Sequence, residues 1–274
     1  MKIKNSCFNC PSSPSKTFKF VGKYQVEKCS GCGLIFLDSY PEDLFSFIDD
    51  IENESEEDLE FWSTPKLIEK YQDIFDHFMN EREFRLKSND FTFSGKALDI
   101  GVGFGLWASR LESKGMKVKG IDVSSDTINY CSNKYSFEVE KKSFERFESS
   151  DKYDLISMFD VLEHFARPVE MLEKVKSLLN EDGLLYIQVP NVIGFKIPFN
   201  HGLGLPYHLW QFDRKSLFHL LNRCGFEILE DWTGVQGIIG AHERDEVNFL
   251  TKLKWNLANK FKIGNRIQVL VKVK

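Results

Sequence analysis

Long apolar runs are missing from this sequence. No stretch of about 18 consecutive apolar residues occurs in its 274 residues, so we expect no membrane-spanning helix. The first residues, Met1–Ser6, lack the apolar run that follows the basic residues of a secretory signal. Both absences favour a cytoplasmic location.

An excess of positive charge is missing as well. The formal net charge is -5, which argues against the broad basic surface that nucleic-acid-binding proteins use. Internal repeats and low-complexity tracts are also absent. By contrast, apolar residues make up 42% and charged residues 28% of the chain, which is typical of a globular protein with one large domain and a small appendage.

Four of the six cysteines fall within the first 32 residues. They form two C-x-x-C pairs, Cys7 with Cys10 and Cys29 with Cys32, separated by 18 residues. In a reducing compartment, clustered cysteines are more often metal ligands than disulfides, and four thiolates at this spacing fit tetrahedral zinc. We therefore predict a zinc ribbon over 1–40, with a redox pair as the alternative. Because a closed four-thiolate site leaves no open position, we assign it a structural role.

The central and main parts of the chain differ in pattern. Residues 41–60 carry ten acidic and no basic residues, which we interpret as a solvated connector with one or two short helices. Apolar residues at helical spacing then predict a helix over about 64–88, so a connector and helical segment fill 41–94.

Over 95–274, short apolar runs alternate with helical segments, which predicts an α/β domain with a parallel sheet and helices on both faces.

The end of the chain follows another pattern. A helix over 214–223 is expected to end at Cys224-Gly225, because glycine is the common residue after a helix. Strands at Phe226–Trp232 and Arg266–Val273 follow, with no regular crossover helix between them. We therefore expect an antiparallel pair that closes one edge of the sheet.

A glycine-rich turn carries the main ligand-binding signal. Residues 99–105 read Asp-Ile-Gly-Val-Gly-Phe-Gly and lead from a strand into a helix. Glycine lets the backbone adopt positive φ and approach a ligand, and the helix start presents free N–H groups. Asp122 and Val123 end the next strand about 20 residues later, where a carboxylate suits the two hydroxyls of a ribose. We predict a nucleotide-type ligand, with a ligand-free tight turn as the alternative. Its contacts would be Gly101, Gly103, Gly105, Asp122 and Val123.

Four motifs together resemble class I S-adenosylmethionine (SAM)-dependent methyltransferases. The order D-x-G-x-G-x-G at 99–105 resembles motif I of that family, whereas nicotinamide-dependent oxidoreductases prefer G-x-G-x-x-G. Residues 153–164 resemble the family's fourth strand and its D-x-L-E-H continuation. Residues 182–191 resemble its fifth strand, and 208–226 resemble its H-x-x-x-F…G-F segment. The resemblance covers about 95–232.

This resemblance implies a Rossmann-like, seven-stranded methyltransferase sheet with an antiparallel edge strand, in addition to the N-terminal zinc ribbon. It also implies that Asp99 lies near the ammonium group of SAM. The adenine would rest against Ser143 and Phe144 after the third strand, although Phe144 could equally pack in the core. Phe159 and Asp160 would line the methionine end of the cofactor.

Histidines are the candidate catalytic residues. A hydroxyl acceptor benefits from a general base with a pKa near the working pH, and histidine is the usual choice. His208 follows a Gly/Pro-rich loop at 202–206 and is the first candidate, with a structural hydrogen bond as the alternative. His164 lies near the expected methyl group, but in the family it is common among members with different substrates, which favours a role in orienting the loop. Asp160 and Glu163 could assist, although acids there often cap the next helix.

We therefore expect a methyltransferase that uses SAM and holds a structural zinc ion. From a resemblance to bacterial sugar and surface-polysaccharide enzymes, we expect O-methylation of a small polar acceptor such as a nucleotide sugar or glycan. One alternative keeps the reaction and changes the acceptor to a quinone-like phenol, an RNA or a protein. Another alternative is a catalytically inert protein whose zinc ribbon docks a partner, which the intact Asp99 and Asp122 disfavour.

Overall fold

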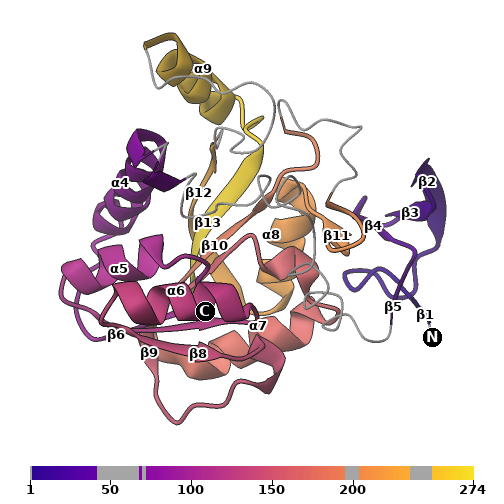
Figure 1. The fold of residues 1–274 in the computed structure, drawn as a ribbon. Coiled ribbons are helices and arrows are strands. Elements are labelled where there is room, and N and C mark those ends of the chain that lie inside the picture. Colours follow the sequence, from indigo (N-terminus) through magenta and orange to yellow (C-terminus); the bar gives the residue numbers. More distant parts are fainter. Residues whose placement is uncertain (1, 42–67, 70–71, 195–203, 235–248) are drawn as a thin grey trace.

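The structure, a computed structural model, describes five segments of the chain: residues 2–41, 68–69, 72–194, 204–234 and 249–274. Figure 1 shows a small unit of strands from the N-terminal residues beside a larger α/β unit. None of the helices in the described segments is long and apolar enough to cross a membrane. Most of the predicted acidic connector, the start of the predicted helix at 64–88 and the start of the predicted loop at 202–206 lie outside these segments.

A seven-stranded sheet forms the centre of the α/β unit, in the order β12-β13-β10-β9-β6-β7-β8. Its strands are β6 (Lys96–Ile100), β7 (Lys117–Asp122), β8 (Glu138–Lys141), β9 (Tyr153–Phe159), β10 (Leu179–Pro190), β12 (Phe226–Gly234) and β13 (Arg266–Val273). β6 pairs in parallel with β7 and β9, and β10 pairs in parallel with β9. The alternation of apolar runs and helices predicted parallel strands, and the family resemblance implied a Rossmann-like sheet of seven strands; both are confirmed.

The two late strands form the predicted antiparallel pair, but their positions differ from the expectation. β13 pairs antiparallel with both β10 and β12, so the antiparallel strand lies one position inside the edge and β12 is the edge strand. A helix that was not predicted, α9 (Phe249–Lys260), lies between them in the sequence. Several of its apolar side chains, including Phe249 and Leu250, are exposed, so they do not mark a buried helical face.

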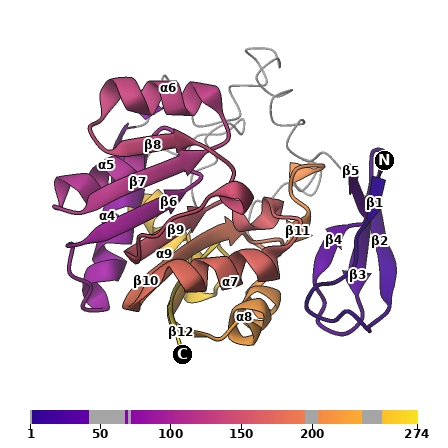
Figure 2. The same cartoon turned by 90° about the horizontal axis from the view of Figure 1, so that it is seen from below.

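Helices cover both faces of the sheet (Figure 2). On one face, α7 (Pro168–Leu178) and α8 (Arg214–Arg223) contribute to one buried apolar cluster. On the other face, a second cluster includes side chains of α4 (Gln72–Ser88), α5 (Leu106–Ser113) and α6 (Ser125–Lys134). Because full burial of one large apolar side chain contributes about 1.5–3 kcal/mol, these clusters are the main source of the sheet's stability.

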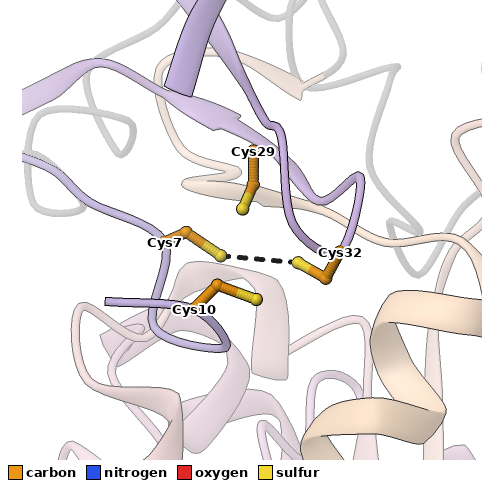
Figure 3. Close-up of side chains that lie close together, drawn as sticks. All are labelled: Cys7, Cys10, Cys29 and Cys32. Atoms are coloured by element: carbon orange, nitrogen blue, oxygen red, sulfur yellow. Dashed lines mark hydrogen bonds between the residues drawn. The ribbon is translucent and has the colours of Figure 1, made fainter. Parts of the chain in front are cut away.

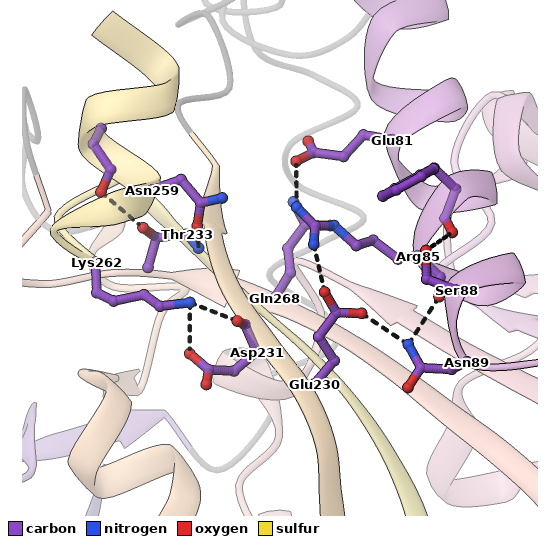
Figure 4. Close-up of polar contacts among 12 residues, drawn as sticks. Glu81, Arg85, Ser88, Asn89, Glu230, Asp231, Thr233, Asn259, Lys262 and Gln268 are labelled. Carbon is purple, nitrogen blue, oxygen red and sulfur yellow. Dashed lines mark hydrogen bonds and ion pairs between the residues drawn. The ribbon is translucent and has the colours of Figure 1, made fainter.

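Polar side chains fasten α4 and α9 to the edge strand β12 (Figure 4). Arg85 of α4 forms an ion pair with Glu230 of β12, and Asn89 donates a 2.8 Å hydrogen bond to the same carboxylate. On the other side, the Thr233 backbone N–H donates a 3.1 Å hydrogen bond to Asn259 Oδ1 of α9. These contacts fix α4 beside the sheet, which matters because α4 carries a residue of the candidate site.

The N-terminal unit consists of short antiparallel strands. β1 (Lys2–Lys4) pairs with β5 (Ser39–Pro41), while β2 (Ser15–Val21), β3 (Tyr24–Cys29) and β4 (Ile35–Leu37) form a second sheet. The fourth strand of that sheet is β11 (Trp210–Gln211), which belongs to the α/β part of the sequence and pairs antiparallel with β4. The two units are therefore joined through a shared sheet.

Candidate functional site

The glycine-rich turn connects β6 to α5 and combines packing with open space. Gly101, Gly103 and Gly105 have φ values of 71°, 50° and 74°, in the left-handed region that glycine adopts without strain. A Cβ atom at Gly101 would lie 2.4 Å from Val161 Cγ2. One at Gly105 would lie within 2.9 Å of Cys131, Tyr135 and Phe137. A Cβ atom at Gly103 would meet no heavy atom of the described residues within 4 Å, so a ligand can approach the backbone there.

Asp122 ends β7 and its carboxylate holds this turn. Its Oδ2 accepts a 2.9 Å hydrogen bond from the Gly103 N–H, and its Oδ1 accepts a 3.0 Å hydrogen bond from the Ser124 N–H. Burial raises the pKa of Asp122, although these backbone N–H groups oppose that change. A carboxylate has about four acceptor positions, so about two remain for the hydroxyls of a ligand.

Asp99 lies at the end of β6 and is 3% exposed. Its Oδ1 accepts a 2.5 Å hydrogen bond from Ser157 Oγ of β9. Burial raises the pKa of Asp99 to about 7, against the opposing effects of Ser157 and of the positive charge of Arg82. A nearby cation, such as the ammonium group of a ligand, would favour the ionised form of this carboxylate.

Arg82 of α4 reaches the same region, and the sequence analysis missed it. Its guanidinium carbon lies 3.7 Å from the centroid of the Phe159 ring, and its Nη2 donates a 3.2 Å hydrogen bond to Gln188 Oε1. Gln188 Nε2 in turn donates a 2.8 Å hydrogen bond to Asp160 Oδ2, and Arg266 Nε lies 2.9 Å from Asp160 Oδ1. The only sequence signal was an arginine within a predicted helix, whose burial depends on how that helix packs.

The chain turns sharply after β9. Asp160 has a φ of 56°, a left-handed conformation that costs a residue with a Cβ atom about 1–2 kcal/mol. Val161 then packs against Gly101, and the 3₁₀ helix η2 (Leu162–His164) follows. The segment that follows β9 is thus packed against the glycine-rich turn through Val161.

The two candidate catalytic histidines lie beside each other. The rings of His164 and His208 are 4.7 Å apart between centroids and nearly perpendicular. His164 Nε2 lies 4.0 Å from Glu163 Oε1, and His208 Nε2 lies 3.9 Å from the same oxygen. The other ring nitrogen of His164, Nδ1, lies 3.0 Å from the Tyr207 carbonyl oxygen. The structure thus assembles these three side chains, which we call the histidine–glutamate cluster; their chemical roles stay predictions.

Glu163 is the most buried member of this cluster. Its side chain is 0% exposed, and neither carboxylate oxygen has a hydrogen-bond partner among the described residues. Burial, together with the negative charge of Asp160, raises the pKa of Glu163 well above its ordinary value, and burial lowers the pKa of His164. Neither η2 nor the next helix, α7, has a side-chain N-cap, so the capping role that we considered for Asp160 and Glu163 is wrong.

The N-terminal unit contacts the segment that carries His208. The Leu37 N–H donates a 2.9 Å hydrogen bond to the Leu209 carbonyl, and the Leu209 N–H donates a 2.9 Å hydrogen bond to the Glu163 carbonyl. β4 and β11 pair directly after Leu209. A continuous set of backbone hydrogen bonds therefore connects the cysteine-bearing unit to the histidine–glutamate cluster.

The four N-terminal cysteine side chains point toward one another (Figure 3). Their sulfur atoms all lie within 4.8 Å of one another, and Cys7 Sγ is 3.5 Å from Cys32 Sγ. Tetrahedral zinc with Zn–S bonds of about 2.3 Å would place its sulfurs about 3.8 Å apart, whereas a disulfide needs about 2.05 Å. Although burial opposes ionisation, the N–H groups of Cys32 and Gly31 lower the pKa of Cys29 to about 7. The donor set and its geometry fit a zinc ion.

The remaining predicted cofactor contacts differ in burial. Phe144 is 3% exposed and packs against Phe147 and Phe165, with ring centroids 6.3 and 6.0 Å away. Core packing, which was one of our two interpretations, accounts for this ring without a ligand. Ser143 and Val123 are half-buried and follow the neighbouring strands β8 and β7. Contacts of these residues with an adenine stay predictions.

Curated relatives match parts of the chain. The ubiquinone biosynthesis O-methyltransferase of Glaesserella parasuis is 33% identical in an alignment 110 residues long that covers 36% of this chain and 47% of that protein. A protein of the same name from Coxiella burnetii is 25% identical in an alignment 175 residues long that covers 58% of this chain and 75% of that protein. The chain thus spans about half the length of the first of these relatives.

Solved structures share the fold at low sequence identity. The magnesium protoporphyrin IX methyltransferase of Synechocystis has a TM-score of 0.54 and 14% identity, over 85% of this chain and 99% of that one. The plantazolicin methyltransferase BpumL has a TM-score of 0.54 and 19% identity, over 85% and 93%. A family model described as a methyltransferase domain matches residues 66–231, more than half of the chain. The chain therefore belongs to the methyltransferase domain family and has the fold of the class I SAM-dependent enzymes.

Proposed function

We propose that this protein transfers a methyl group from SAM to a hydroxyl oxygen of a small acceptor. The observation that carries the proposal is the turn at Gly103, which has open space beside its backbone. Two carboxylates flank it: the buried Asp99 on β6, which leads into the turn, and the half-buried Asp122 at the end of the adjacent strand β7. Ligands of parallel α/β sheets bind at the carboxyl ends of the strands where the chain order reverses. β6 lies at that position, between β7 and β9.

The site residues suit the three polar parts of SAM. The remaining acceptor positions of Asp122 would bind the ribose hydroxyls. The ammonium group would pair with Asp99, whose carboxylate is costly to ionise without a cation. The carboxylate of the methionine end would pair with Arg82, whose buried Nε has no partner among the described residues. Asp160 and Phe159 would complete the wall of that end.

The reaction is an in-line displacement. The acceptor oxygen attacks the methyl carbon, the bond from that carbon to the sulfonium sulfur breaks, and the hydroxyl proton leaves. The protein contributes mainly by aligning acceptor and methyl group. We propose His208 as the group that accepts the proton or orients the hydroxyl, and His164 as its neighbour, because both lie beside the turn that connects β9 to η2.

We propose a quinone-like phenol as the acceptor. The curated relatives are named ubiquinone biosynthesis O-methyltransferases, and this name supports a phenolic hydroxyl. The nucleotide sugar or glycan expected from the sequence resemblance receives no support from these relatives. We also propose that Cys7, Cys10, Cys29 and Cys32 bind one structural zinc ion, so that 1–40 act as a zinc ribbon.

Calorimetry with S-adenosylhomocysteine (SAH), followed by a transfer assay, tests this function. The wild-type chain should bind SAH, and Asp122→Ala should weaken binding at least about tenfold, because a ribose contact with a carboxylate contributes on the order of 1.5–3 kcal/mol. Methyl transfer from labelled SAM to a dihydroxybenzoate should exceed transfer to a nucleotide sugar. Absence of both binding heat and a thermal shift would exclude the enzyme function, and transfer to the nucleotide sugar alone would exclude the phenol.

A further inference from the structure

We propose that Glu163, His164 and His208 form a second metal site, which binds a divalent transition-metal ion through two imidazole nitrogens and one carboxylate oxygen. Two histidines and one carboxylate are a ligand set that zinc and iron(II) sites use with further positions open. Binding of the ion by these residues is independent of the proposed function. Its use in methyl transfer rests on that function.

The ligand atoms already converge. One ligand atom from each of the three side chains lies within 4.8 Å of the other two. Both histidine Nε2 atoms approach the same oxygen, Glu163 Oε1, at 4.0 and 3.9 Å. Metal–ligand bonds of about 2.0–2.1 Å in tetrahedral geometry would place ligand atoms about 3.4 Å apart. The two histidine–glutamate separations therefore exceed the expected ligand spacing by only about 0.5–0.6 Å, and the two histidine ligand atoms lie within 4.8 Å of each other.

The buried carboxylate of Glu163 is the independent observation that indicates a ligand. The side chain of Glu163 is 0% exposed, so water does not reach its carboxylate. Neither carboxylate oxygen has a hydrogen-bond partner among the described residues. A buried carboxylate without a partner is costly, and native proteins satisfy such groups with a cation or with hydrogen bonds. A divalent ion between the histidines would satisfy it.

The contacts of the two histidine rings resemble those that orient histidine ligands in metal sites. His164 Nδ1 lies 3.0 Å from the Tyr207 carbonyl, so a proton on Nδ1 leaves the Nε2 lone pair for a metal ion. The His208 ring packs against Gly204, where a Cβ atom would lie 2.3 Å from His208 Nδ1. The His208 N–H also donates a 2.8 Å hydrogen bond to the Gly204 carbonyl. These contacts hold both rings in place before an ion binds.

The site would promote methyl transfer through its open positions. An acceptor hydroxyl that binds a divalent cation gives up its proton more readily, because the cation stabilises the resulting oxyanion. As a ligand of such an ion, His208 would orient the hydroxyl and would not accept its proton, which would pass to water. The acceptor oxygen would then form the new bond to the methyl carbon as the carbon–sulfur bond breaks. A phenol with two adjacent hydroxyls could occupy two open positions.

Cobalt(II) titration of the full-length chain tests the site, because thiolate ligands give intense sulfur-to-cobalt absorption whereas imidazole and carboxylate ligands do not. The wild-type chain should bind one cobalt ion with this absorption and a second ion without it. Glu163→Gln, which keeps the side-chain shape, and His208→Ala should each weaken the second ion at least about tenfold. His219→Ala, which removes an exposed histidine of α8, is the matched control and should retain both ions.

Two results would overturn the site: a wild-type chain that binds only the thiolate-ligated ion, or a second ion that persists at full affinity in both Glu163→Gln and His208→Ala. SAH binding by each variant shows that its α/β unit is folded. The same measurement separates this proposal from the proposed function. If the wild-type chain binds the second ion but no SAH, only the proposed function is excluded. If it binds SAH but no second ion, only the metal site is excluded.

Discussion

The four-cysteine cluster and the histidine–glutamate cluster both offer atoms suited to a metal ion, but the chain builds them in different ways. The cysteines come from two short turns within 1–40, and each pair is fixed by its own C-x-x-C spacing. Glu163 and His208 come from distant segments that meet because η2, which follows β9, is hydrogen-bonded to Leu209, the residue before β11. Local spacing therefore predicts the first cluster, and tertiary structure alone produces the second.

The two clusters are not independent. Leu209 accepts a hydrogen bond from the N-terminal unit through its carbonyl and donates one to the Glu163 carbonyl through its N–H. His208 immediately precedes this residue. The N-terminal unit thus helps to hold His208 in position. The zinc ion proposed in that unit would therefore affect the proposed catalysis without contacting the substrate.

The largest expected effect comes from Cys29→Ser. Loss of one of the four proposed ligands should abolish zinc binding. The N-terminal unit should unfold as a result, because a bound zinc ion would supply most of the folding energy of a unit this small. The N-terminal unit should then lose its protection from hydrogen exchange, including at the Leu37 N–H, and turnover should fall by more than tenfold because β11 loses its partner strand. Metal analysis, exchange by mass spectrometry and the transfer assay measure these outcomes.

Cys224→Ala is the matched control, since Cys224 is buried in the core outside the cluster and should leave the metal content unchanged. Full turnover of Cys29→Ser without zinc would contradict the dependence of the histidine–glutamate cluster on the four-cysteine cluster. The N-terminal unit would then not support His208.

The next largest effect is expected for His208→Ala. His208 either accepts the proton or, as a metal ligand, orients the hydroxyl, and loss of such a group should lower kcat by about 10²–10⁴-fold, the range typical of general-base catalysis. SAH affinity should stay unchanged, because the proposed cofactor carboxylates Asp99 and Asp122 lie on other strands. Steady-state kinetics and calorimetry measure both, with His219→Ala as the control. An unchanged kcat would remove His208 from the chemistry.

How far the sequence predicts the site depends on whether a signal is local. The glycine-rich turn and Asp122 were predicted because strand, turn and helix follow one another in the chain. The structure joins them by a hydrogen bond from the Gly103 N–H to the Asp122 carboxylate. Arg82 was missed because its burial depends on how α4 packs against the sheet. For Glu163 the sequence left a role in the chemistry and a role as a helix cap open, because no local pattern reveals that two histidines approach it.

The fold shows the same division. Apolar alternation predicted the parallel strands, because strands buried between helices carry continuous apolar runs. The pairing of β11 with β4 was not predicted, because a strand of two residues has no periodicity and its partner lies far away in sequence. The helix α9 was missed because its exposed apolar side chains follow no buried stripe.

A smaller effect is expected for the pH dependence of SAM affinity. It shows whether Asp99 or the histidine–glutamate cluster titrates when the cofactor binds. The folded-state pKa of Asp99, about 7, lies above the unfolded value. The contribution of this group to the stability of the free protein is therefore fully present below the unfolded pKa, near 3.9, and is lost as pH rises through about 7. In the proposed complex, SAM would reverse this preference for the protonated form, because its ammonium group would favour ionised Asp99.

SAM affinity should therefore fall as pH drops below about 7, by at most about tenfold per pH unit. Calorimetry at several pH values measures this dependence. Asp99→Asn should bind SAM more weakly and without this pH dependence, while His208→Ala should retain it. A pH dependence that disappears in His208→Ala instead would assign it to the histidine–glutamate cluster.

The smallest expected effect separates docking of the N-terminal unit from its folding. Asn9, which is 6% exposed, donates a 3.1 Å hydrogen bond to the Ser216 carbonyl at the start of α8. Asn9→Ala should weaken this contact by about 1 kcal/mol without loss of zinc. Asn5→Ala is the control, because Asn5 donates to the Leu37 carbonyl within the N-terminal unit itself. If only Asn9→Ala increases hydrogen exchange at Leu209 and lowers kcat, then docking rather than zinc binding is what positions His208.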